Sequence, residues 1–140
     1  RSTLVIQMKK RVEGEPKIAA SAAFAVDPIL KHIFIVDDDI DPHDMDQVLW
    51  AFTTRFQADR DLIIMPNFLG GHLNPVTYGW NREEKGPMET KMIIDCTKPA
   101  APITFPPACR VPPDVVERVD PARLLKSFAD AADLVNAPMD

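Results

Sequence analysis

The chain has 140 residues, of which 46% are hydrophobic and 26% charged, a composition typical of one globular domain. Its formal net charge of -5 argues against a nucleic-acid or anionic-membrane partner, because like charges repel. No apolar run approaches the ~18 residues of a membrane span, and Arg1 with its polar followers does not resemble a secretory signal, so we expect a cytoplasmic protein.

The predicted elements alternate between strands and helices. Residues 3–12 alternate apolar and polar side chains, which predicts a strand with one exposed face. Residues 16–26 predict an Ala-rich helix that begins with a proline. Ile18, Ala22 and Val26 share one face, and the small residues suggest that this face packs closely. Three apolar runs predict strands covered on both faces: 32–37, 61–66 and 91–96. This order predicts an α/β fold with a mainly parallel sheet flanked by helices.

A further helix is predicted after residue 41. Asp41 stands where an N-cap residue is expected, Pro42 takes the first helical position and Asp44 follows three residues after the cap. Apolar residues then recur mainly at spacings of three and four, as on the buried face of a helix: Met45, Val48, Leu49, Phe52 and Phe56.

Five acidic residues lie within "IVDDDIDPHD", residues 35–44. The helix start accounts for two of them, whereas Asp37, Asp38 and Asp39 leave the carboxyl end of a strand, where open α/β sheets bind ligands. A magnesium-dependent, receiver-like phosphotransfer site is therefore an alternative, and "IDCTKP" supplies the Asp, Thr and Lys that it needs. Receiver domains keep these three on separate strands, so we expect cations such as Arg55, or backbone amides, to hold the acids instead of metal.

The cysteines and histidines do not form a metal-ligand set. Cys96 and Cys109 have no companion ligand at a useful spacing, so we expect free thiols. His32 and His43 show no ligand spacing with His72. We therefore expect no metal site in this chain.

The last third of the chain is rich in proline, with eight of the fourteen prolines between Pro87 and Pro121. We predict an α/β domain over residues 1–98 and a Pro-rich extension with carboxy-terminal helices over 99–140. Two short amphipathic helices are expected in this extension, packing on another subunit or on their own domain. Their apolar residues are Val115, Val116 and Val119, then Leu124, Leu125, Phe128 and Leu134.

Three features of residues 32–61 occur together: the acidic run "VDDDIDP", the helix "VLWAFTTR" and a following "RD" before an apolar strand. This combination resembles the opening of the carboxy-terminal domain of the UbiD family of reversible, prenylated-flavin-dependent decarboxylases. The resemblance continues in "KMIIDCTKP" and in the upstream "VIQMKKRVEGEPKIAASAAF". It covers residues 3–99, and the tail is only loosely similar.

The resemblance implies a carboxy-terminal domain or subunit of a (de)carboxylase that acts on an aromatic or α,β-unsaturated carboxylic acid, closing the active site and mediating assembly. The family's catalytic arginine and paired glutamates lie upstream of this domain, and no motif here matches them. We expect prenylated FMN and its divalent metal to be bound mainly by residues outside this chain, which should be inactive alone.

The expected partner is a larger companion chain or an amino-terminal domain that carries the catalytic residues, in a homo- or hetero-oligomer. Because the chain starts at Arg1 and runs directly into a strand, we expect a piece of a longer enzyme. A non-catalytic assembly module with the same fold is the alternative.

Two stretches are expected near the active site. The first is the turn "FAVDPILK", residues 24–31, which the resemblance places in the cleft between domains. It implies Phe24, Asp27, Pro28 and Ile29 as substrate- or cofactor-pocket residues. The alternative is an ordinary turn between helix and strand, in which Asp27 accepts a local hydrogen bond and Pro28 ends the helix.

The second stretch is "NFLGGHLNPVTYGW", residues 67–80, which follows the carboxyl end of a strand and carries two adjacent glycines. We expect Gly71, His72 and Leu73 to form a pocket edge there. A role for His72 as a general acid or as a ligand of the substrate carboxylate is open, beside that of a solvated side chain.

Arg55 ends the predicted helix, where a cation is favoured. Its guanidinium group can also reach carboxylates on neighbouring loops, and structural ion pairs with Asp38, Asp41 or Asp61 are expected. Trp50 lies away from the apolar stripe of this helix, and we expect it in a buried contact.

Overall fold

The computed structural model describes residues 2–77, 86–109, 111–118, 125, 126 and 128. The chain divides into two compact units, residues 1–105 and 106–140. The elements of the first unit are β1 (Thr3–Met8), α1 (Glu15–Val26), β2 (His32–Asp37), α2 (Met45–Arg55), α3 (Ala58–Asp61), β3 (Leu62–Leu69), the 3₁₀ helix η1 (Pro75–Thr77) and β4 (Met88–Cys96). The second unit contains α5 (Pro113–Arg118).

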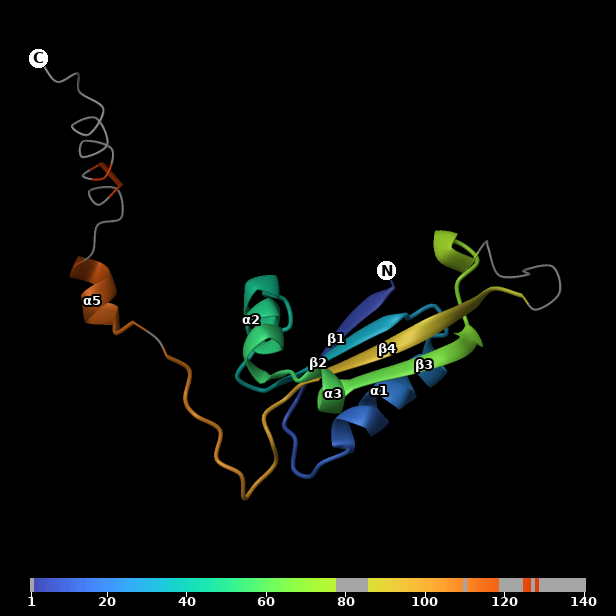
Figure 1. Ribbon diagram of the computed structural model, residues 1–140, viewed down its shortest axis with the longest axis horizontal. Helices are drawn as coiled ribbons and strands as arrows, with labels where there is room; N and C mark the ends of the chain where they lie inside the picture. Colours follow the sequence, from blue (N-terminus) through green and yellow to red (C-terminus); the bar gives the residue numbers. More distant parts are fainter. Residues whose placement is uncertain (1, 78–85, 110, 119–124, 127, 129–140) are drawn as a thin grey trace, which may run out of the picture. The chain divides into compact units, whose positions relative to one another are not determined.

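The four strands form one sheet in the order β1-β2-β4-β3, which Figure 1 shows. The strands β1, β2 and β4 pair in parallel, and β3 pairs antiparallel with β4 at the edge. The predicted α/β fold with a mainly parallel sheet is therefore confirmed. The prediction that β3 is covered on both faces is wrong, because most of its residues are exposed or half-buried. An antiparallel edge strand needs no crossover helix and can leave one face uncovered.

The helix α1 packs on one face of the sheet. It begins after Gly14, whose φ of 92° lies in the left-handed region that favours glycine, and Pro16 stands in its first turn. Ala20 and Phe24 enter a core with Leu30, Ile33, Ile35 and Ile93. The expected buried face of this helix is wrong, because Ile18 is 72% and Val26 85% exposed. Two rows of side chains at i, i+4 spacing could face the sheet, and the row with the aromatic ring of Phe24 does so.

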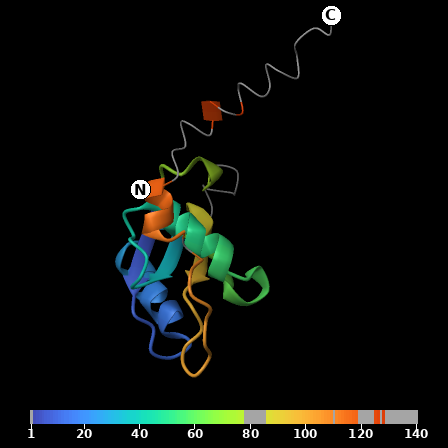
Figure 2. The same ribbon diagram turned by 90° about the vertical axis from the view of Figure 1, so that its left-hand side faces the viewer.

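The helix α2 packs on the opposite face (Figure 1, Figure 2). Val48 and Ala51 meet Val36, Ile94 and Cys96 there. The thiol groups of the two cysteines are free, as expected. Burial raises the pKa of the Cys96 thiol to about 12, so this cysteine is a core residue and not a nucleophile.

The start of α2 differs from the prediction. Its N-cap is Asp44, whose carboxylate accepts the backbone N–H groups of Asp46 and Gln47 at 3.0 and 3.3 Å. Asp41 instead accepts the backbone N–H of His43 at 2.9 Å in the turn that precedes the helix. The predicted cap at Asp41 is therefore wrong, because the chain makes one turn before it becomes helical.

The second unit begins at residue 106, whereas the predicted division lies between residues 98 and 99. Residues 99–105 therefore belong to the same unit as the sheet. Its helix α5 contains Val115 of the first predicted amphipathic helix. Leu124 and Leu134 of the second predicted helix lie outside the described residues.

Candidate functional site

The two stretches predicted near an active site lie against each other where β2 and β4 begin. In the turn after α1, the Asp27 carboxylate accepts the N–H of Ile29 at 2.9 Å, which fixes the turn locally. A Cβ atom added to Gly71 would lie 3.4 Å from the Ile29 side chain, so the second stretch packs on this turn. The fold thus brings residues 27–31 and 67–77 together at the end of the sheet where β2 and β4 begin.

Beneath the turn lies Lys91, a lysine of β4 that is 1% exposed. Its ammonium group donates to the carbonyl oxygen of Pro28 at 2.8 Å and to that of Leu30, and lies 3.4 Å from a carboxylate oxygen of Glu89. It also lies 5.0 Å from the centre of the Phe24 ring. The three donors of the ammonium group therefore have three oxygen acceptors, in a site closed to water.

Glu89 connects this lysine to the second stretch. Its other carboxylate oxygen accepts the side-chain amide N–H of Asn74 at 2.6 Å, and the residue is 7% exposed. The backbone of Gly70 passes so close that an added Cβ would lie 2.7 Å from Glu89 Cγ. Glycine is therefore required at this position for the carboxylate to occupy its site.

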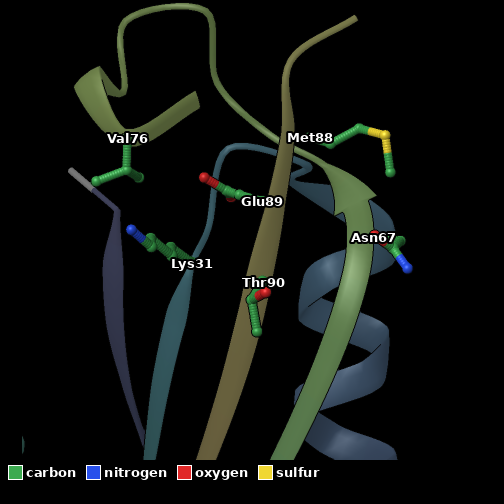
Figure 3. A pocket seen from close by; sticks show the side chains of 6 residues that line it. All are labelled: Lys31, Asn67, Val76, Met88, Glu89 and Thr90. Atoms are coloured by element: carbon green, nitrogen blue, oxygen red, sulfur yellow. The ribbon is translucent and has the colours of Figure 1, made fainter. Parts of the chain in front are cut away.

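A pocket of about 250 Å³ opens beside this pair. Figure 3 shows Lys31, Val76 and Glu89 extending toward one another from the start of β2, from η1 and from β4. The lining residues are Lys31, Asn67, Val76, Met88, Glu89 and Thr90. A cation beside the apolar side chains of Val76 and Met88 suits an anion that has an apolar body.

The residues predicted for a pocket surround this opening without lining it. Phe24 is buried in the core, and Asp27, Pro28 and Ile29 form the turn next to Lys31. In the second stretch Leu73 is 93% exposed. Gly71 and His72 lie in the same loop, between the lining residues Asn67 and Val76. The predicted stretches thus provide three of the lining residues, but at neighbouring positions.

Glu89, Lys91 and Asn74 were not predicted from the sequence. One signal for the first two is present in "METKMIID", where Glu89 and Lys91 share the alternating face of Ile93. Opposite charges two residues apart on the buried face of a strand indicate a paired network. The prediction began this strand at Lys91, so the pair was not recognised.

The acidic run after β2 forms a second polar cluster. Arg55, which is 5% exposed, donates to Asp37 at 2.7 Å and to both carboxylate oxygens of Asp39 at 2.9 Å. Lys98 also donates to Asp37 through its backbone N–H and to Asp39 through its ammonium group. The expectation that cations and backbone amides hold the acids is confirmed for Asp37 and Asp39.

The partners of Arg55 differ from those expected. Asp38 is exposed, and its backbone carbonyl accepts a hydrogen bond from the Gln7 side chain. Asp41 holds the turn before α2. The structure thus places Asp37 and Asp39, instead of Asp38 and Asp41, on the guanidinium group. A buried cation needs a buried counter-charge, and Asp37 is the buried member of the run.

The environments of these two acids shift their pKa values in opposite directions. Burial raises the pKa of Asp37, against the opposing effects of the Lys98 N–H and the Arg55 charge. The hydrogen bonds from Arg55 and Lys98 hold the pKa of Asp39 far below its usual range, although burial opposes this. Within the described part of the chain, no three His, Cys, Asp or Glu side chains gather in an arrangement that could hold a metal ion.

A family model described as the 3-octaprenyl-4-hydroxybenzoate carboxy-lyase C-terminal domain matches residues 1–96. The chain belongs to this UbiD family. Anhydromevalonate phosphate decarboxylase of Aeropyrum pernix is 45% identical over 95 residues, which are 68% of this chain and 20% of that protein. Phenolic acid decarboxylase of Sedimentibacter hydroxybenzoicus is 34% identical over 119 residues, 81% of this chain and 24% of that protein.

A solved structure, that of the UbiD-class enzyme HmfF from Pelotomaculum thermopropionicum in complex with FMN, is similar to the fold. The TM-score is 0.67 and the identity 32%, over 85% of this chain and 25% of that chain. This UbiD chain therefore spans about a fifth to a quarter of the length of the proteins that it matches.

The volume of the pocket bears on whether it could enclose a cofactor by itself. Small-molecule sites usually enclose about 300–1,000 Å³, and the 250 Å³ beside Lys31 is smaller than this range. The described residues of this UbiD chain therefore do not enclose a complete small-molecule site. Among the described residues, no helix is both long and apolar enough to cross a membrane.

Proposed function

We propose that this chain is the carboxy-terminal part of a prenylated-FMN-dependent (de)carboxylase that acts on an aromatic or α,β-unsaturated carboxylic acid. The observation that carries the proposal is the meeting of residues 27–31 and 67–77 at a pocket with an ammonium group, in a chain of the UbiD family. The relatives act, by their names, on anhydromevalonate phosphate and on phenolic acids.

The prenylated flavin, when bound, supplies an electron sink for the carbon that loses or gains the carboxyl group. The residues of this chain bind the ligand and help to enclose it. Lys31 offers a positive charge to an anionic group of the ligand, while Val76 and Met88 offer apolar contacts to its body. FMN in the similar HmfF structure supports a flavin cofactor. The divalent metal and the proton-transferring residues belong to the remainder of the enzyme.

The test is CO₂ release by the complete enzyme loaded with prenylated FMN. Gallate, a hydroxylated cinnamic acid and anhydromevalonate phosphate serve as substrates, since they represent an aromatic, an unsaturated and a phosphorylated acid. We expect release from at least one of them, and none from the 140-residue chain alone. A loaded enzyme that binds these acids and releases no CO₂ contradicts the proposal and favours a non-catalytic assembly module.

We further propose that residues 106–140 mediate subunit contacts, because they form a unit apart from the sheet. Leu125 and Phe128 in this unit are each 70% exposed, as apolar residues that pack on a partner would be in a single chain. Truncation of the complete enzyme after Phe105 is expected to lower the number of subunits per oligomer, measured as the oligomer mass in size-exclusion chromatography divided by the mass of the truncated chain. An unchanged number of subunits rejects the assembly role.

A further inference from the structure

We propose that Glu89 and Lys91 act as one buried clamp that positions both stretches at the pocket, residues 27–31 and 67–77. The pair lies in β4, which is held on both sides by strands of the sheet, so it offers a fixed reference for two irregular segments. The consequence for catalysis rests on the proposed function, whereas the consequence for the two segments does not.

The Lys91 end of the clamp holds the turn. Its ammonium group donates to the backbone carbonyls of Pro28 and Leu30, residues 63 and 61 positions away in the sequence. These two acceptors lie on either side of Ile29, so the lysine fixes the direction of the chain as it enters β2. The neighbouring Lys31 lines the pocket, and its position depends on this turn.

The Glu89 end holds the second stretch. The carboxylate accepts from Asn74, whose backbone carbonyl in turn accepts the N–H and the side-chain hydroxyl of Thr77 at 3.1 and 2.8 Å. Thr77 is fully buried and ends η1, the element that carries Val76 into the pocket. A continuous series of hydrogen bonds thus runs from Lys91 through Glu89 to the far side of the opening.

The Glu89–Lys91 ion pair is better suited to positioning the two segments than to stabilising the fold. A buried ion pair gains little over well-packed apolar residues, because the cost of removing two charges from water offsets their attraction. Two carbonyl oxygens and an amide, however, would be left without partners if Met or Leu replaced the pair. The side chain of Lys91 is 2% and that of Glu89 1% exposed. Glu89 also lines the pocket, whereas Lys91 acts on it only through the segments that the clamp holds.

Hydrogen exchange of the complete enzyme tests the clamp without any need for activity. In Lys91→Met, we expect the amides of both 27–31 and 67–77 to exchange faster by about tenfold or more. In Asn74→Ala, only 67–77 should change. Lys10→Met is the matched control, because the side chain of this lysine is also nearly buried and pairs with Glu13 at 3.1 Å. Lys10 follows the carboxyl end of β1, at the end of the sheet away from the pocket. This variant should leave both segments unchanged.

Two further variants keep the test decisive if Lys91→Met does not fold. Gly70→Ala leaves the charges in place but forces the Glu89 carboxylate to move, and Glu89→Gln keeps an acceptor for Asn74 while it removes the counter-charge of the lysine. Both should accelerate exchange in the two segments. The clamp would be overturned if exchange became faster throughout the sheet, or if each variant accelerated exchange in only one of the segments 27–31 and 67–77.

Kinetics then separate positioning from catalysis. If the proposed function holds, Gly70→Ala and Glu89→Gln should raise KM or lower kcat in CO₂ release, while Lys10→Met leaves both unchanged. If the unmodified enzyme releases no CO₂, the proposed function fails and the exchange result still decides whether the clamp exists. Exchange that is unchanged in an active enzyme overturns the clamp alone.

Discussion

Arg55 is the residue on which the acidic run depends. Its guanidinium group is buried and forms a salt bridge with Asp37 and a two-oxygen contact with Asp39. The guanidinium carbon Cζ lies 5.1 Å from the centre of the Trp50 ring. A planar guanidinium group can bind one carboxylate through two parallel hydrogen bonds and donate to a second carboxylate, a bidentate geometry that an ammonium group does not offer. Asp37 and Asp39, at the end of β2 and just after it, are thus a structural pair that compensates the charge of Arg55, whereas the exposed Asp38 is not part of this cluster.

Replacing this arginine should therefore be costly. Arg55→Met leaves the carboxylate of Asp37 buried without its counter-charge, and we expect the free energy of unfolding to fall by about 3–5 kcal/mol. Urea denaturation of the 140-residue chain measures this. Arg60→Met is the control, because that side chain is 61% exposed and its pair with Asp61 should contribute about 1 kcal/mol or less. Equal losses in both variants would contradict a buried cluster.

The partly exposed member of the cluster gives a pH-dependent prediction. The folded pKa of Asp39 is lowered, so its carboxylate stabilises the fold above the ordinary value of about 4 and loses this effect as the pH falls toward the folded pKa. Asp39→Asn should lower the free energy of unfolding by about 1 kcal/mol at pH 7, allowing for solvent screening of a side chain that is 45% exposed. The difference from wild type should shrink below pH ~4. A constant difference from pH 7 to pH 3 would reject the ion pair.

At the scale of elements, the strands could be predicted better than the helices. β2 spans 32–37 as expected, because an unbroken apolar run between polar residues fits only a strand covered on both faces. The buried face of α1 could not be predicted, since Pro16, Ala20 and Phe24 compete with Ile18, Ala22 and Val26 at the same spacing. Only contact with the sheet decides between two such rows.

The cap of α2 illustrates the same limit and can be tested. Asp41 and Asp44 are both acceptable cap residues in the sequence, and the turn closed by Asp41 shifts the cap to Asp44. Asp44→Ala should lower the free energy of unfolding by about 1 kcal/mol, because two backbone N–H groups lose their acceptor. Asp41→Ala should cost less. Thermal denaturation of both variants decides, and the reverse order would restore Asp41 as the cap.

At the scale of the whole molecule, the sequence located the two segments of the candidate site but not what joins them. Each segment has a local signal, namely the turn residues Asp27 and Pro28 or the paired glycines. Their contact depends on strand order, and Glu89 and Lys91 lie more than 50 residues from the turn. The spacing of Glu89 and Lys91 indicates that they pair with each other, but only the fold brings Asn74 and the carbonyl groups of Pro28 and Leu30 to them.

Residues 27–31 and 67–77 are proposed to form one wall of the active site of a decarboxylase. The most direct test of this proposal is CO₂ release by the complete, prenylated-FMN-loaded enzyme carrying Val76→Trp, which fills the pocket. Val12→Trp is the control, because Val12 and Val76 are both 59% exposed and only Val76 lines the pocket beside Lys31. We predict that kcat/KM falls about tenfold or more in Val76→Trp and stays within about twofold of wild type in Val12→Trp. Equal, wild-type turnover in both variants would contradict the proposal.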